Sequence, residues 1–116
     1  MDTKNFKASE FACPCCGRNE IKGELMEALQ ELRDYLGYPI IINSGYRCKK
    51  HNAEVGGVSN SQHLYGIAAD IYVAEISTAE LARAANEITA FRNGGIGTYS
   101  TWVHVDIRKK RARWRG

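Results

Sequence analysis

Two histidine–aspartate spacings stand out among the residues that could do chemistry. His63 is followed by Asp70 after six intervening residues, and His104 is followed by Asp106 after one; the chain contains only three histidines. Imidazole nitrogens and carboxylate oxygens hold catalytic zinc, which takes three protein ligands and keeps a fourth position for water. His63, Asp70 and His104 would supply such a set. The alternative interpretation is that these are ordinary polar residues near strand ends.

The local sequence around these residues favours the metal site. It contains the segments NSGYR (43–47), SQHLYGIAAD (61–70) and WVHVD (102–106). In this order they resemble the zinc D-Ala-D-Ala metallopeptidases, the family that includes bacterial D,D-carboxypeptidases, D,D-dipeptidases and phage L-alanyl-D-glutamate endolysins. The resemblance extends over residues 11–108. SxHxxGxAAD is its most specific part, SGYR is weaker, and HVD alone carries little information.

The resemblance implies roles for individual residues. His63, Asp70 and His104 are expected to bind Zn²⁺, which polarises a peptide carbonyl and lowers the pKa of its water. Arg47 is expected to be catalytic, because its planar fork suits a carboxylate or the oxyanion that forms on the attacked carbonyl. Ser61 is expected to hydrogen-bond the substrate. A surface salt bridge for Arg47 and a loop-capping role for Ser61 are the alternatives.

The general base is the point where the chain departs from the family pattern. Many relatives carry an acidic residue three positions before the last histidine ligand, and here that position is Thr101. Asp106 is the nearest candidate for the base, since it shares a strand face with His104. Asp106 could instead orient the imidazole of His104. Both roles for Asp106 stay open, as does a metal site that binds without cleaving.

Hydrophobic spacing predicts an α+β fold with two main helices and a small, largely antiparallel sheet. A helix ending near Gly37 and Pro39 and a second one opened by the capping-box pattern Ser77 to Glu80 are indicated. We expect helices over residues 21–37 and 77–91 and strands over residues 40–42, 68–73, 96–99 and 102–107. The resemblance implies the hedgehog/D,D-peptidase fold.

Length and composition indicate a single zinc peptidase domain over residues 1–116 with a basic C-terminal tail at 108–116. The chain has 116 residues, 44% hydrophobic and 25% charged, as in ordinary globular proteins. No stretch has the ~18–20 apolar residues of a membrane span. Because no signal-peptide core is visible, we expect synthesis in the cytoplasm and action at the bacterial cell wall after release. We expect a monomer.

The cysteines form a second cluster with more than one interpretation. Cys13, Cys15 and Cys16 lie close together, and Cys48 precedes His51 by three positions. Cys13-x-x-Cys16 with Cys48-x-x-His51 has the ligand spacing of a structural zinc site. A disulfide to Cys48 and plain buried thiols are the alternatives.

Together these features predict a zinc metallopeptidase that hydrolyses stem-peptide or crosslink bonds of peptidoglycan involving D-amino acids. Endopeptidase cleavage is favoured over trimming of a terminal D-Ala, as in a phage or prophage-type lysis enzyme. The basic tail is expected to be solvated or attracted to an anionic envelope. No nucleic-acid motif is present, so nucleic acid is not the expected partner. A non-catalytic zinc-containing wall-binding module and a phage structural module are the alternatives.

Overall fold

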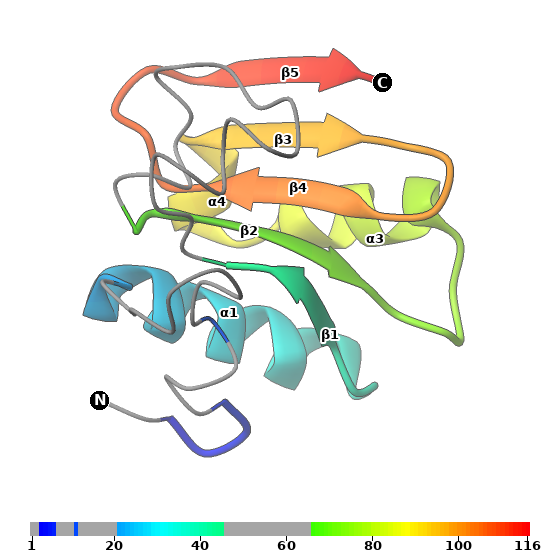
Figure 1. Cartoon of the computed structure of the whole chain (residues 1–116), viewed down its shortest axis with the longest axis horizontal. Helices are drawn as coiled ribbons and strands as arrows, with labels where there is room; N and C mark the ends of the chain where they lie inside the picture. The colour runs from blue at the N-terminus through cyan, green and yellow to red at the C-terminus, as the bar shows by residue number, and fades with distance from the viewer. Residues whose placement is uncertain (1–2, 7–10, 12–20, 46–65) are drawn as a thin grey trace.

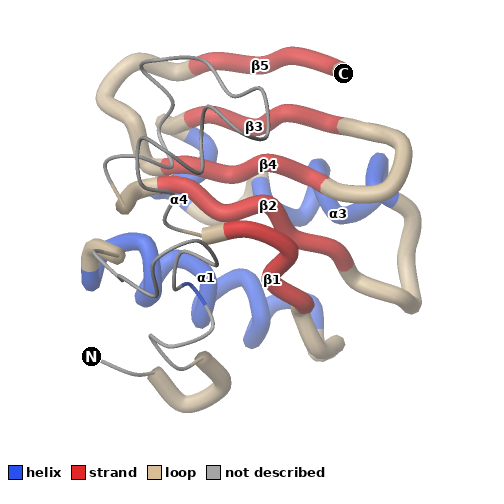
Figure 2. The backbone as a smooth tube through the Cα atoms, viewed as in Figure 1, coloured by secondary structure: helices blue, strands red, loops and turns tan. Residues whose placement is uncertain are grey.

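The computed structural model describes residues 3–6, 11, 21–45 and 66–116, and within them the chain forms a five-stranded mixed sheet with helices on one side (Figures 1 and 2). The strand order is β1-β2-β4-β3-β5. The strands are β1 (Ile41–Ser44), β2 (Ala68–Tyr72), β3 (Gly95–Thr98), β4 (Val103–Asp106) and β5 (Ala112–Arg115). The helices are α1 (Gly23–Leu36), α3 (Thr78–Ala85) and α4 (Thr89–Arg92). The predicted α+β class is therefore confirmed.

The pairing of the strands brings distant polar residues together on one face. β2 pairs antiparallel with β4, with Asp70 opposite His104, and β3 pairs antiparallel with β4, with Gly95 opposite Asp106. β1 also pairs antiparallel with β2, and β5 alone among the described strands pairs parallel, with β3. The sheet is therefore largely antiparallel, as expected. Because side chains alternate along a strand, His104 and Asp106 lie on the face away from the helices.

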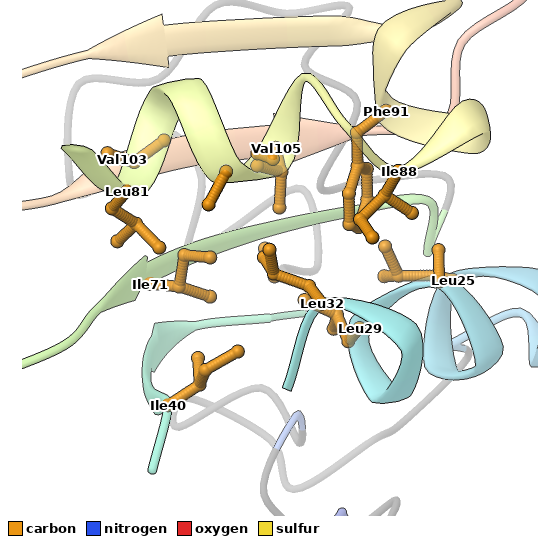
Figure 3. Packing of buried hydrophobic residues seen from close by; sticks show 14 of the residues in the cluster. Leu25, Leu29, Leu32, Ile40, Ile71, Leu81, Ile88, Phe91, Val103 and Val105 are labelled. Carbon is orange, nitrogen blue, oxygen red and sulfur yellow. The ribbon is translucent and has the colours of Figure 1, made fainter. Parts of the chain in front are cut away.

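The hydrophobic core lies between the sheet and the helices (Figure 3). The buried leucines of α1 face it at helical spacing, and β2 and β4 contribute Ile71, Val103 and Val105. Gly37 ends α1 in the left-handed conformation at φ 74°, and its N–H donates to the carbonyl of Arg33. The helix predicted near residues 21–37 is confirmed. None of the described helices is both long and apolar enough to cross a membrane.

The second predicted helix begins as expected but ends early. Ser77 and Glu80 form the predicted capping box before α3. The helix then stops at Ala85, Ile88 is extended, and α4 follows as a separate turn. Arg92 donates to the carbonyls of Asn86 and Glu87, which stabilises the break. The prediction of one continuous helix to residue 91 was wrong, although Ile88 and Phe91 are buried as the spacing required.

The basic segment at 108–116 differs from the solvated tail that was expected. Ala112–Arg115 forms the edge strand β5, and Trp114 is half-buried opposite Gly97 of β3. A Cβ at Gly97 would collide with the indole of Trp114, so glycine is what allows the ring to pack so closely. Burial of a large aromatic ring stabilises this pairing, whereas charge alone predicts a solvated segment.

Candidate metal centre

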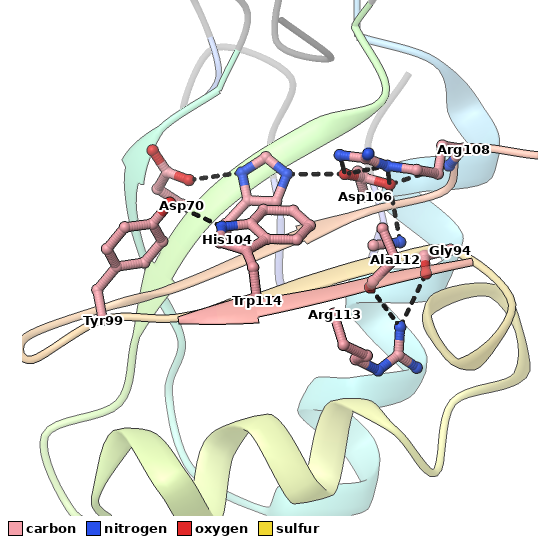
Figure 4. Close-up of polar contacts among 10 residues, drawn as sticks. Asp70, Gly94, Tyr99, His104, Asp106, Arg108, Ala112, Arg113 and Trp114 are labelled. Carbon is pink, nitrogen blue, oxygen red and sulfur yellow. Dashed lines mark hydrogen bonds and ion pairs between the residues drawn. The ribbon is translucent and has the colours of Figure 1, made fainter. Parts of the chain in front are cut away.

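The imidazole of His104 lies between two carboxylates on the face of the sheet opposite the helices (Figure 4). Its Nδ1 lies 3.0 Å from Oδ1 of Asp70, and its Nε2 lies 2.8 Å from Oδ2 of Asp106. His104 is only 8% exposed. Burial alone would lower the pKa of His104, but the hydrogen bonds that its ring donates to Asp106 and Asp70 outweigh burial and raise the pKa above its ordinary value.

Asp106 is fully buried and both of its carboxylate oxygens accept hydrogen bonds. Oδ1 accepts from the backbone N–H groups of Gly95 and Arg108, at 2.9 and 3.1 Å. Oδ2 accepts from Nη2 of Arg108 at 2.6 Å, and Nε of Arg108 reaches both oxygens. Burial would raise the pKa of Asp106, but the hydrogen bonds from His104 and Arg108 outweigh it and hold the pKa well below its ordinary value. Asp106 is therefore an ionised acceptor enclosed by donors.

An aromatic side chain from β5 packs against this group. The ring centroids of Trp114 and His104 lie 5.1 Å apart, and the guanidinium of Arg108 lies 5.1 Å from the centroid of a Trp114 ring. Nε1 of Trp114 donates to the hydroxyl of Tyr99 at 2.8 Å, and Tyr99 stacks on Trp102 with centroids 4.4 Å apart. The orientation of His104 is thus maintained by contacts along its edge and across its ring.

Sequence reasoning missed two of these residues. Arg108 continues the spacing of two that links His104 to Asp106, so strand alternation carried two residues further would have identified it. Trp114 gave no comparable local signal, because its contact with His104 depends on the parallel pairing of β5 with β3.

The Asp70–His104 pair has the geometry of two ligands that could share one metal ion. Ligands at 2.0–2.2 Å from a tetrahedral zinc ion lie about 3.3 Å apart. The observed Nδ1–Oδ1 distance is 3.0 Å. The contact of Nε2 with Asp106 also matches the way ligand imidazoles donate their other N–H to a carboxylate. The imidazole and carboxylate of this pair are donor types that suit a zinc ion.

Two of the predicted motifs lie partly within the described residues, next to the Asp70–His104 pair. Ser44, at the end of β1, is paired with Asp70, so the NSGYR segment begins beside a candidate ligand. Gly66, in the SQHLYGIAAD segment, has φ 71°, a left-handed conformation that favours glycine, just before β2. Thr101 is exposed in the turn between β3 and β4.

Several predicted residues lie outside the described part of the chain, and their roles stay predictions. They are Cys13, Cys15, Cys16, Arg47, Cys48, His51, Ser61 and His63. No group of three or more potential metal ligands is found among the described residues, and the predicted third ligand, His63, is not one of them.

Comparison with known proteins adds an independent finding. The model of the family Peptidase M15 matches residues 4–106. The chain is also similar to a zinc D-Ala-D-Ala carboxypeptidase of Streptomyces albus G, with 44% identity over 83 residues. That match covers 69% of this chain and 32% of the relative, so the chain matches about a third of the relative's length.

Proposed function

Because the chain belongs to the Peptidase M15 family, we propose that it is a zinc metallopeptidase that hydrolyses peptide bonds of peptidoglycan involving D-amino acids. The main support is the 3.0 Å contact between Asp70 and Nδ1 of His104, with Nε2 of the same ring held by Asp106. The name of the Streptomyces relative supports zinc as the metal and a D-Ala peptide as the substrate class.

We propose that His63, Asp70 and His104 hold the ion. Zinc bound there supplies a Lewis acid for the peptide carbonyl and a water with a pKa near ~7. Asp70 contributes a negative charge to the site, which offsets part of the charge of the cation. The half-buried position of Asp70 and the low exposure of His104 keep both ligands partly desolvated, which strengthens their attraction for a cation.

Of the two roles considered for Asp106, its contacts favour positioning of His104. Asp106 lies at the Nε2 edge of the imidazole, whereas Asp70 lies at the Nδ1 edge. A general base must come within about 3 Å of the proton it takes, directly or through one water. A buried carboxylate on the far side of the ring does not meet that condition. Asp106 instead keeps a proton on Nε2 and leaves the Nδ1 lone pair for the metal.

Arg108 extends this support outward. Its guanidinium donates to both oxygens of Asp106 while its face lies against Trp114. A planar fork fixed in this way keeps Asp106 ionised and fixes the direction of its lone pairs. A group other than Asp106 then accepts the proton from water. We also propose that Arg47 stabilises the oxyanion and that Ser61 binds substrate.

We further propose endopeptidase cleavage in a stem peptide or crosslink, as in a phage or prophage-type lysis enzyme that reaches the wall after release from the cytoplasm. The resemblance of the motifs to phage endolysins supports this narrower proposal. A non-catalytic zinc-containing wall-binding or phage structural module is the second candidate, and Thr101 at the usual acidic position is the observation that favours it.

The test is digestion of purified peptidoglycan by zinc-loaded protein, followed by mass spectrometry of the products. Endopeptidase activity should convert crosslinked dimers into monomers or shorten stem peptides internally, whereas carboxypeptidase activity should release free D-Ala. The chelator-treated protein and a His104→Ala variant serve as controls. Absence of every product from protein that carries one zinc per chain would contradict the enzyme proposal and favour the binding module.

A further inference from the structure

The positive charge of the chain is concentrated in its last described segment. Residues 108–116 contain six of the sixteen Lys and Arg residues and no Asp or Glu. β5 fixes part of this segment to the sheet, so these charges have defined places. Arg113 and Trp114 project from opposite faces of β5, toward the helices and toward His104 respectively (Figure 4).

On the helix side, an open groove of about 690 Å³ lies between α3 and β5. Arg83, Asn86 and Glu87 line it from α3 and the turn that follows, and Arg111, Arg113 and Arg115 line it from the basic segment. Glu87 is the acidic residue of this lining, against four arginines. The groove therefore has an excess of positive charge contributed by two separate elements.

The four arginines have different tasks. The guanidinium of Arg113 donates to Oδ1 of Asn86 at 2.7 Å and to the carbonyls of Gly94 and Arg92 at 2.8 and 2.9 Å, so it ties β5 to the end of α4. By contrast, the side chains of Arg83, Arg111 and Arg115 are exposed, and no hydrogen bond from them to another described residue is seen. Glu80, one turn before Arg83 on α3, attracts its guanidinium electrostatically. These three guanidinium groups are available to an external anion.

We propose that this groove binds the phosphodiester groups of an anionic cell-wall polymer. A guanidinium presents a planar fork that matches two phosphate oxygens, and several cations around one groove raise the local concentration of a polyanion. The groove lies on the opposite face of the sheet from His104, so a polymer bound there does not contact the described residues of the metal centre. The choice of a wall polymer rests on the proposed function; the anion site itself rests on the groove.

Nucleic acid fits the groove less well. Proteins that bind single strands usually offer free aromatic faces on which bases stack. Trp114 is the aromatic residue of the described lining, and its ring already lies against His104 and Arg108. The groove thus offers guanidinium groups for phosphates and no free ring for bases among its described residues.

The experiment measures binding of the full zinc-loaded chain to a fluorescent poly(glycerol phosphate) oligomer at about 50 mM salt. The test variant is Arg83→Gln/Arg115→Gln, and the matched control is Lys109→Gln/Lys110→Gln, which removes the same charge from exposed residues outside the groove lining. We expect the test variant to bind about 10- to 30-fold more weakly and the control less than about 5-fold more weakly. Hydrolysis of small soluble muropeptides should be unchanged in both.

Three outcomes would overturn the proposal. Equal weakening in the two double variants would mean diffuse attraction to the basic segment. Unchanged binding in Arg83→Gln alone would remove α3 from the site. Stronger competition by single-stranded DNA than by poly(glycerol phosphate), at equal phosphate concentration, would assign the groove to nucleic acid. Binding is measured separately from hydrolysis, so the two proposals can fail separately. A protein that binds the polymer through Arg83 but hydrolyses nothing would contradict the peptidase proposal and would still support the anion site in the groove.

Discussion

Replacement of Asp106 by Asn is the most informative single change at the metal centre, because it keeps the shape of the side chain and removes its charge. If the new amide group takes the place of Oδ2, it faces Nε2 of His104 and Nη2 of Arg108, which contact that oxygen at 2.8 and 2.6 Å. Two charge-assisted hydrogen bonds, each worth about 1.5–3 kcal/mol, are then lost. Arg108 is 27% exposed and can recover part of this from water. We therefore expect the free energy of unfolding to fall by about 3 kcal/mol.

The same change should weaken zinc binding. An amide that no longer accepts from Nε2 allows the proton of His104 to move to Nδ1, which then cannot bind a metal. We expect zinc affinity to fall by about 10–100-fold, and saturating zinc to restore much of the hydrolytic rate.

The assays are urea unfolding of the metal-free protein, competition for zinc with a chromogenic chelator, and rate measured against zinc concentration. Asp34→Asn is the matched control, since Asp34 is exposed and, within the described part of the chain, its side chain accepts a hydrogen bond only from Nε2 of Gln30. A rate lower by about 10²–10⁴ with unchanged zinc affinity would identify Asp106 as the general base and refute the positioning argument. No change in rate, affinity or stability would make Asp106 a bystander.

Four further predictions concern the same centre. Trp114→Ala should lower the free energy of unfolding by about 2–4 kcal/mol, with Trp114→Phe in between, as urea titration can check; equal values for all three proteins would refute the packing role. His63→Ala/His104→Ala should abolish zinc retention with the fold intact, so undiminished zinc by metal analysis would end that ligand assignment. Arg47→Lys should reduce kcat/KM by about 10–1000-fold without changing zinc content, and wild-type kinetics would reassign Arg47 to a structural role. In metal-free protein the raised pKa of His104 should stabilise the fold at pH values below the ordinary pKa of 6.5, and this stability should be lost as pH rises through the pKa of the folded state. Urea unfolding from pH 5 to 9 should show the loss. The His104→Ala variant is the control and should not show it.

Local patterns predicted most of the elements that carry the site. The spacing of two between His104 and Asp106 placed both on one strand face, and their direct contact agrees with that prediction. The sequence also predicted the helix ends formed by Ser77 and Glu80 of α3 and by Gly37 of α1, because each of these residues acts within one helical turn. The family motifs added the zinc peptidase class, which no periodicity could supply.

Features that depend on distant segments were not predictable in the same way. The approach of Asp70 to His104, which are 34 positions apart, was predicted from the family motifs and not from a local pattern, because it requires the register between β2 and β4. The basic segment was expected to be solvated because it is rich in Lys and Arg. Trp114 instead packs on the sheet, because Gly97 on the neighbouring strand has no side chain and leaves space for the indole. The break after Ala85 was missed because Ile88 and Phe91 continue the helical spacing of α3, although the backbone leaves the helix at Asn86 and is extended at Ile88.

The parallel pairing of β5 with β3 also has a consequence for the order in which the centre is completed. β3 and β4 are joined by a tight turn and can form a hairpin on their own, which already sets His104 beside Asp106. β5 joins later, since Gly95 pairs with Ala112 across seventeen positions. The contact of Trp114 with the ring of His104 depends on this longer-range pairing, whereas the contact of His104 with Asp106 lies within β4 itself. Full cover of the imidazole is therefore expected only once β5 has joined the sheet.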